Sequence, residues 1–221
     1  MNRMKPYDIP HKALRNALSQ LTVLSGRTNY SDPKEVETLY HLAMDVFDLL
    51  TAHQTDENEV TLAELEKRCP GSSRHDREEH VKIHAGQEKL ERLISKIATN
   101  SATNEELSDY QYEFYLSISE FHGKYLEHIA HEERVTQHIL WQYFSDDELI
   151  SFGNRIMADI PPESWLTWFR FLVPAQSHPE RVGFLTGFKQ TVPPPFFTQG
   201  MEVINQVLTE KEYSDLQTAL L

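Results

Sequence analysis

Four stretches of the chain carry apolar residues at intervals of three and four, the spacing that places side chains on one face of an α-helix. Short loops separate these stretches, and short loops favour antiparallel packing of neighbouring helices. The sequence therefore predicts an all-α fold in which residues 1–144 form an antiparallel, up-down-up-down four-helix bundle. The helices are expected from near Asp8 to Gly26, from an opening at Ser31-Asp32-Pro33 through Leu50, from about Asp76 to Ala98, and from about Asn104 to Phe144.

The pattern changes after residue 144. Ser145 with Glu148, and Thr209 with Glu212, have the spacing of capping boxes, and prolines interrupt the shorter helical stretches between them. Aromatic residues are frequent in this part, which favours a local core packed on the bundle; a homodimer surface is the second interpretation. We expect residues 145–221 to form a C-terminal helical extension.

Polar residues occupy the inward faces of the four helices where the apolar residues stop. One stripe extends back to a histidine, two continue into a His-x-x-x-Glu pair, and one leads back to a His-x-x-x-His pair. Residues four apart share a helix face, so each pair is expected to point in one direction. In chain order, the candidate metal ligands are His11, His53, Glu57, His80, His84, His128 and Glu132.

Antiparallel packing would bring these seven side chains to one level, because alternate helices carry them near the start and toward the end. Unpaired buried polar groups cost about 1–3 kcal/mol each, a cost that a bound metal removes. Imidazole suits iron, copper or zinc, and carboxylates can bridge two hard cations. Each residue alone is more readily a core or surface residue, but coincident placement on four helices favours a metal site. Seven ligands suit two ions better than one.

The seven positions resemble the metal-binding pattern of hemerythrin-like (HHE cation-binding) domains. The segments PHKALRNALSQL and EKRCPGSSRHDREEHVKIH are also similar to members of this family. The stretch after residue 145 resembles an extension found on bacterial single-protein members. The resemblance covers residues 1–144 and implies a hemerythrin-like four-helix bundle.

The resemblance further implies a non-haem di-iron centre, with two Fe ions joined by an oxo or hydroxo bridge and by carboxylates. It implies that His11 and His53 bind one iron and that His80, His84 and His128 bind the other. The iron with fewer histidines would keep an open position for dioxygen or another small oxidant.

The last carboxylate departs from the family pattern. Invertebrate oxygen carriers have an aspartate five residues after the histidine, whereas this chain has Glu132 at four residues and Glu133 at five. Helical phase favours Glu132, since Glu133 is rotated by about 100° from the inward line. We expect Glu132 to supply the second bridging carboxylate.

Composition narrows the possible partners and the location. The formal net charge is −13, and no Lys/Arg-rich run is present, so nucleic acid is not an expected partner. Cys69 is the only cysteine, which excludes an intrachain disulfide. No signal-peptide pattern or membrane-spanning apolar stretch is present, so we expect a cytoplasmic protein with no membrane contact.

Two classes of function remain open. The first is a di-iron-binding protein that binds or senses dioxygen or handles iron. The second is an enzyme whose di-iron centre acts on peroxide or nitric oxide, or an iron donor for iron–sulfur cluster repair. A metal-free helical interaction module is disfavoured, because it leaves the aligned histidines and glutamates unexplained.

Overall fold

A computed structural model describes residues 3–99 and 104–221, with side chains from 3–99 and 108–221. Within these ranges the chain is helical and contains no strand, so the predicted all-α class is confirmed. The arrangement as an up-down-up-down bundle with an extension remains a prediction. The helices are α1 (Asp8–Arg27), α2 (Pro33–Asp56), α3 (Leu62–Arg68), α4 (Arg74–Ala98), α5 (Asn104–His131), α6 (Gln137–Tyr143), α7 (Asp146–Asp159), α8 (Pro162–Ala175), α9 (His178–Thr191), α10 (Pro194–Val207) and α11 (Glu210–Ala219), with π-helical turns η1 (Glu57–Thr61) and η2 (Glu132–Thr136).

Several helix starts follow from local side-chain chemistry. The Asp32 side chain accepts a hydrogen bond from the backbone N–H of Lys34 at the start of α2. The predicted capping box at Thr209 and Glu212 is present at the start of α11. A further box, Ser177 with Glu180, starts α9 and was not predicted, although its sequence has the same signature.

The chain divides into two compact units, of which unit 1 is Met1–Asp8 with Ala17–Ala158 and unit 2 is Ile9–Asn16 with Asp159–Leu221. The predicted division after residue 144 differs from this one. Most of α7 belongs to unit 1, because Leu149 packs in a buried cluster with Phe144, Leu140 and Leu65.

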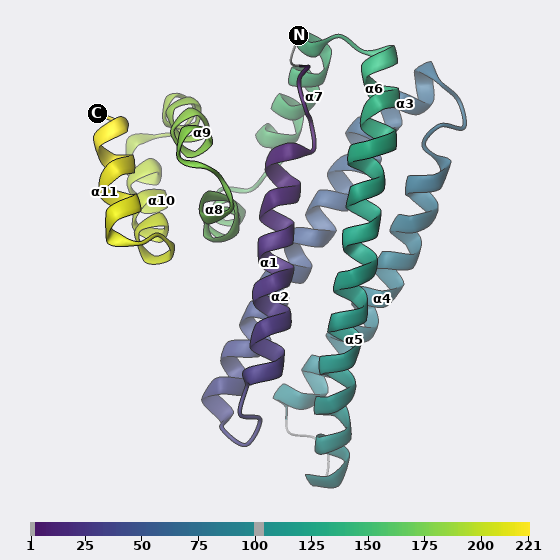
Figure 1. The fold of residues 1–221 in the computed structure, drawn as a ribbon, viewed down its shortest axis with the longest axis vertical. Helices are drawn as coiled ribbons and strands as arrows, with labels where there is room; N and C mark the ends of the chain where they lie inside the picture. The colour runs from purple at the N-terminus through teal and green to yellow at the C-terminus, as the bar shows by residue number, and fades with distance from the viewer. Residues whose placement is uncertain (1–2, 100–103) are drawn as a thin grey trace. The chain divides into compact units, whose positions relative to one another are not determined.

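Unit 1 contains the long helices α2, α4 and α5 and the later part of α1 (Figure 1). The buried Gln87 side chain of α4 donates to the Phe47 carbonyl and the Thr51 hydroxyl of α2, at 3.2 and 2.8 Å. The hydroxyl oxygen of Thr22 in α1 lies 3.0 Å from the Nδ1 atom of His122 in α5. The apolar stripes predicted to face inward are buried, among them Leu39, Ala43, Val46, Leu50, Leu90 and Ile94.

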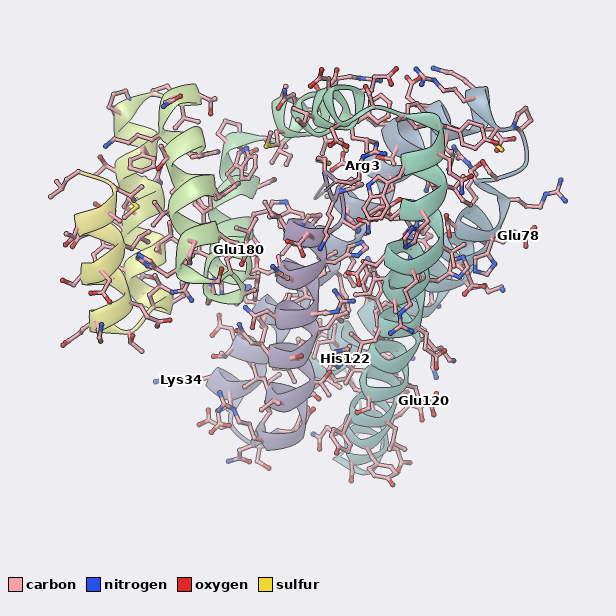
Figure 2. All side chains as sticks on the ribbon, turned by 45° about the horizontal axis from the view of Figure 1, so that its top comes forward. Arg3, Lys34, Glu78, Glu120, His122 and Glu180 are labelled. Carbon is pink, nitrogen blue, oxygen red and sulfur yellow. The ribbon has the colours of Figure 1, made fainter. Side chains whose placement is uncertain are left out.

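The N-terminal segment of unit 1 is held at the corner between α6 and α7. Arg3, labelled in Figure 2, forms an ion pair with Asp146 at 2.6 Å and donates to the carbonyls of Trp141 and Phe144. The Trp141 indole N–H donates in turn to the Met4 carbonyl at 2.7 Å. These contacts place the residues just before α1 beside the end of α6.

Unit 2 has a local aromatic core, as the sequence predicted. The Phe188 ring lies 4.9 Å from Trp165 and 5.0 Å from Phe169, measured between ring centroids. Arg181 is buried and donates to the Val173 carbonyl at 2.8 Å. Glu180, labelled in Figure 2, pairs with Lys12 at 2.5 Å.

Across the described ranges, none of the helices combines the length and apolar character that crossing a membrane requires.

Candidate metal centre

Two π-helical turns begin at the two glutamates predicted to bind metal. Glu57 is the first residue of η1, which follows α2, and Glu132 is the first residue of η2, which follows α5. A π turn inserts one residue into a helix and is found frequently at functional sites. In a regular helix Val135, three residues after Glu132, would lie on the inward face with it. With the inserted residue, Thr136 is buried and Val135 is 42% exposed.

Glu57 lies between two imidazoles. Its Oε1 atom is 3.2 Å from the Nε2 atom of His53, and its Oε2 atom is 3.3 Å from the Nε2 atom of His80. All three side chains are buried. One carboxylate therefore directs each of its oxygens at a different histidine.

Glu132 forms the other side of the same cluster. Its Oε1 atom lies 3.2 Å from the Nε2 atom of His128 and 3.5 Å from the Nε2 atom of His80. The Glu132 side chain is fully buried. The ligand atoms of Glu57, His80, His128 and Glu132 all lie within 4.8 Å of one another.

These separations fit ligands that share an ion. Metal–nitrogen and metal–oxygen bonds of about 2.0–2.2 Å, meeting at angles near 90–110°, place neighbouring ligand atoms roughly 3.0–3.5 Å apart. The imidazole–carboxylate pairs are 3.2–3.5 Å apart. Buried carboxylates in one layer also repel each other, and a multivalent cation removes that repulsion. The residues therefore fit a metal centre in chemistry and in spacing.

A neighbouring amide orients His80. The Nδ1 atom of His80 lies 3.1 Å from the Oδ1 atom of Asn58, which can only accept a hydrogen bond, so Nδ1 carries the proton. The Arg77 guanidinium holds Asn58 in place by donating a hydrogen bond to the backbone carbonyl of Asn58 at 2.9 Å. This arrangement turns Nε2 toward the carboxylates, as hydrogen-bonded partners of metal-binding histidines do.

The carboxylates also change the protonation of His80. Burial alone would lower its pKa, but hydrogen bonds to Glu132 and Glu57, and the charges of these two residues, raise the pKa to about 9. In the metal-free protein a proton therefore occupies a position that a cation can take.

His84 lies outside this cluster, which corrects the prediction that it is a ligand. Its side chain is 54% exposed and pairs with Glu88 at 3.5 Å on the surface of α4. The inward line of α4 runs from His80 to Ile83 and Gln87, all buried. His84 is rotated about 100° from Ile83, toward the exposed face. The structure thus brings His53, Glu57, His80, His128 and Glu132 together without His84.

Glu133 is also outside the described cluster. It is half-buried, whereas Glu132 is fully buried and faces His80 and His128. This agrees with the helical phase expected from the sequence. Bridging by Glu132 remains a prediction.

His11 is fully buried on α1. It belongs to the segment Ile9–Asn16, which is part of unit 2, whereas the five clustered residues belong to unit 1. Its role as a ligand remains a prediction.

Sequence reasoning missed two buried groups beside the cluster. Burial, together with the negative charges of Glu57, Glu132 and Asp76, raises the pKa of Tyr7 well above its usual value and keeps its hydroxyl protonated. Asp76 is buried and accepts a hydrogen bond from the Thr136 hydroxyl at 2.7 Å. Asp76 lies four residues before His80 on the inward face of α4, a spacing that could have marked it. Tyr7 precedes α1 and comes close to the glutamates through folding.

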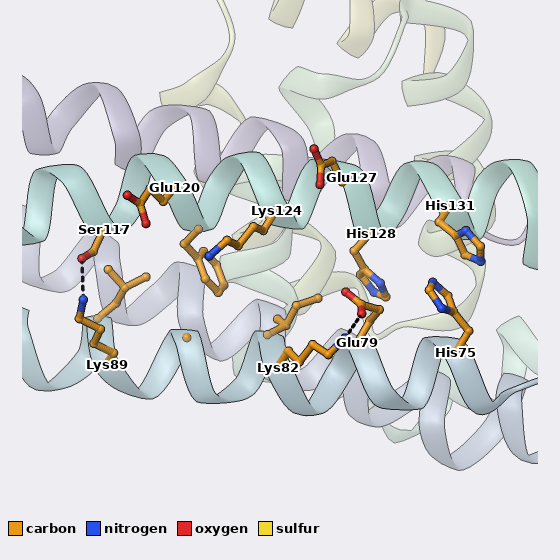
Figure 3. A pocket seen from close by; sticks show the side chains of 14 residues that line it. His75, Glu79, Lys82, Lys89, Ser117, Glu120, Lys124, Glu127, His128 and His131 are labelled. Atoms are coloured by element: carbon orange, nitrogen blue, oxygen red, sulfur yellow. Dashed lines mark hydrogen bonds and ion pairs between the residues drawn. The ribbon is translucent and has the colours of Figure 1, made fainter.

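A surface groove between α4 and α5 reaches the cluster from outside (Figure 3). It has a volume of about 600 Å³, and His128 is part of its wall. Phe121 lines it further along and packs close to Gly86. The groove therefore connects solvent with one of the clustered imidazoles.

Comparisons with known proteins do not assign the chain to a family. No protein-family model matches it. One relative, F-box/LRR-repeat protein 5 of Danio rerio, is 23% identical over 152 residues, which is 67% of this chain and 21% of that protein. The chain thus spans about a fifth of this relative's length. Membership of the hemerythrin-like group remains a prediction.

Proposed function

We propose that the chain is a hemerythrin-like protein that holds two iron ions on the buried histidines and glutamates. In this proposal α1, α2, α4 and α5 form the up-down-up-down bundle expected from the sequence. His11, which is buried on α1, is kept as a ligand in this proposal because the family resemblance implies it. The proposed location is the cytoplasm.

The observation that carries this proposal is the position of Glu57. A carboxylate that directs one oxygen at His53 and the other at His80 is arranged to bridge two cations. A single ion would bind one oxygen of this carboxylate and the histidine beside it. The other buried histidine would then have no metal.

Exclusion of His84 changes the ligand assignment. His11 and His53 would bind one iron, and His80 and His128 would bind the other, with Glu57 and Glu132 shared. Each ion then has two imidazoles and two carboxylates, instead of the two and three histidines that the family resemblance implies. Four protein ligands on each ion leave positions for water or a small oxidant.

Iron bound in this way supplies reversible redox chemistry and affinity for dioxygen. The protein would hold the ions in a buried layer, orient His80 through Asn58, and admit small molecules along the groove at His128. We therefore propose that the chain binds or senses dioxygen, or handles iron.

The experiment is anaerobic loading with ferrous iron, followed by exposure to dioxygen, peroxide or nitric oxide while absorption spectra are recorded. We expect dioxygen to produce near-ultraviolet charge-transfer absorption. His53→Ala should lose bound iron and the absorption, whereas His84→Ala, a histidine variant outside the cluster, should keep both. Equal behaviour of the two variants would refute the assignment.

A further inference from the structure

A second group of metal-binding side chains lies outside the buried cluster. His75 and Asp76 are at the start of α4, and His131 is the last residue of α5. We propose that these three residues form a solvent-accessible site for one divalent transition-metal ion. Their ligand atoms all lie within 4.8 Å of one another.

The two imidazoles face each other across the helices. The ring centroids of His75 and His131 are 4.1 Å apart, and Figure 3 shows the two side chains directed toward one another from neighbouring helices. The Nε2 atom of His131 lies 3.8 Å from the Oδ1 atom of Asp76. Small side-chain rotations would bring all three ligand atoms onto one ion.

Asp76 supplies the independent observation that points to a ligand. Its side chain is 1% exposed, and its Oδ2 atom accepts the hydrogen bond from Thr136. Its Oδ1 atom, which faces His131, is buried and has no hydrogen-bond partner among the residues that the structure describes. A buried carboxylate oxygen without a donor is costly, and a cation between it and the imidazoles would satisfy it.

The donor set selects the kind of metal. Two imidazoles and one carboxylate suit Fe(II), Co(II), Ni(II) or Zn(II), whereas Mg²⁺ and Ca²⁺ prefer sets made of oxygen. His75 is exposed and the side chain of His131 is 34% exposed, so an ion can reach the site from solvent. Both histidines also line the groove that reaches His128.

This site is separate from the proposed di-iron centre, because none of its three residues belongs to the buried ligand set. It would exchange metal quickly, since solvent reaches two of its ligands. The buried ions would leave slowly, since their release requires the helices to open.

The difference in exchange rate allows a direct test on the full chain. Chelator-treated protein is loaded anaerobically with Co(II), excess ion is removed, and a strong chelator is added in a stopped-flow instrument. We expect a fast phase of one ion per chain. His75→Ala and His131→Ala should each abolish it, and Asp76→Asn, which keeps the shape and a hydrogen-bond acceptor for Thr136, should weaken binding in this phase at least tenfold.

His84→Ala is the matched control, because His84 is another exposed histidine on α4 and should leave the fast phase unchanged. Absence of the fast phase in the unaltered chain, or its persistence in both His75→Ala and His131→Ala, would overturn the inference. A fast phase without any slow phase would instead support this site and contradict the buried di-iron centre.

Discussion

His80 is the residue on which the buried cluster depends most directly. Its imidazole lies within 3.5 Å of both Glu57 and Glu132, and Asn58 fixes its orientation. In the metal-free protein its proton partly balances the two carboxylates. A metal ion that binds there must displace this proton.

The raised pKa of His80 predicts how the metal-free protein responds to pH. A histidine whose folded pKa exceeds its unfolded value stabilises the fold fully below the unfolded pKa, near 6.5, and loses this contribution as pH rises through the folded pKa, about 9. The free energy of unfolding, obtained from thermal unfolding, should decrease by an amount on the order of 3 kcal/mol between pH 6 and pH 10. His80→Gln should flatten this profile, and an unchanged slope would show that another group titrates.

Metal binding should release the same proton. Calorimetric titration of ferrous iron at pH 7.5, in two buffers of different ionisation enthalpy, should report release of about one proton on filling the cluster. The His80→Gln variant should release fewer protons when it binds ferrous iron. Equal release from both proteins would place the displaced proton elsewhere.

Glu132 and Glu133 test the helical phase of the site. Glu132→Ala should abolish retention of two irons, because it removes the carboxylate that faces His80 and His128. Glu133→Ala should retain both ions. The opposite outcome would mean that the centre follows the five-residue spacing of the oxygen carriers.

At the scale of the elements, the two π turns distinguish this site from a regular helical bundle. The helices themselves follow from their apolar periodicity, and α4 ends at the predicted Ala98. A continuous 3.6-residue period would turn Val135 inward after Glu132, but η2 inserts a residue and Val135 is exposed.

The five residues of the described cluster could be predicted to face inward, because they continue apolar stripes. His84 could not be placed correctly from the pair spacing alone, since Ile83 takes the inward position after His80. Asp76 could have been found by the same periodicity, since it lies four residues before His80 on the inward face of α4. Tyr7 could not be predicted, because its proximity to the glutamates arises from tertiary packing. The aligned His-x-x-x-Glu pairs therefore carried the information about the cluster, whereas the position of Tyr7 follows only from the folded chain.

Close packing in unit 2 gives a prediction at the same scale. A Cβ atom at Gly200 of α10 would lie 2.7 Å from the buried Phe169 ring, so Gly200→Ala should destabilise unit 2 by about 1–3 kcal/mol. Gly187→Ala is the control, because Gly187 lies in α9 with open space around it and alanine favours helix there by up to about 1 kcal/mol. Denaturant unfolding measures the change in the free energy of unfolding for both variants. A neutral Gly200→Ala would show that the Phe169 ring moves freely.

At the scale of the whole molecule, the net charge of −13 and the buried cluster both favour the binding of cations. An acidic protein concentrates cations near its surface. Bound ions would also stabilise the fold by about 4 kcal/mol when free metal is a thousandfold above its dissociation constant. Metal should therefore control the stability of the part of the chain that carries the cluster.

The most direct measurement of the central claim is the iron content of the chain after anaerobic loading and dialysis. It is best made on His75→Ala as well as on the unaltered protein, so that the proposed surface site does not contribute to the count. We predict two irons retained per chain in both proteins. Folded protein that retains only a trace of iron, or one ion per chain, would contradict the account of Glu57 as a carboxylate shared by two ions.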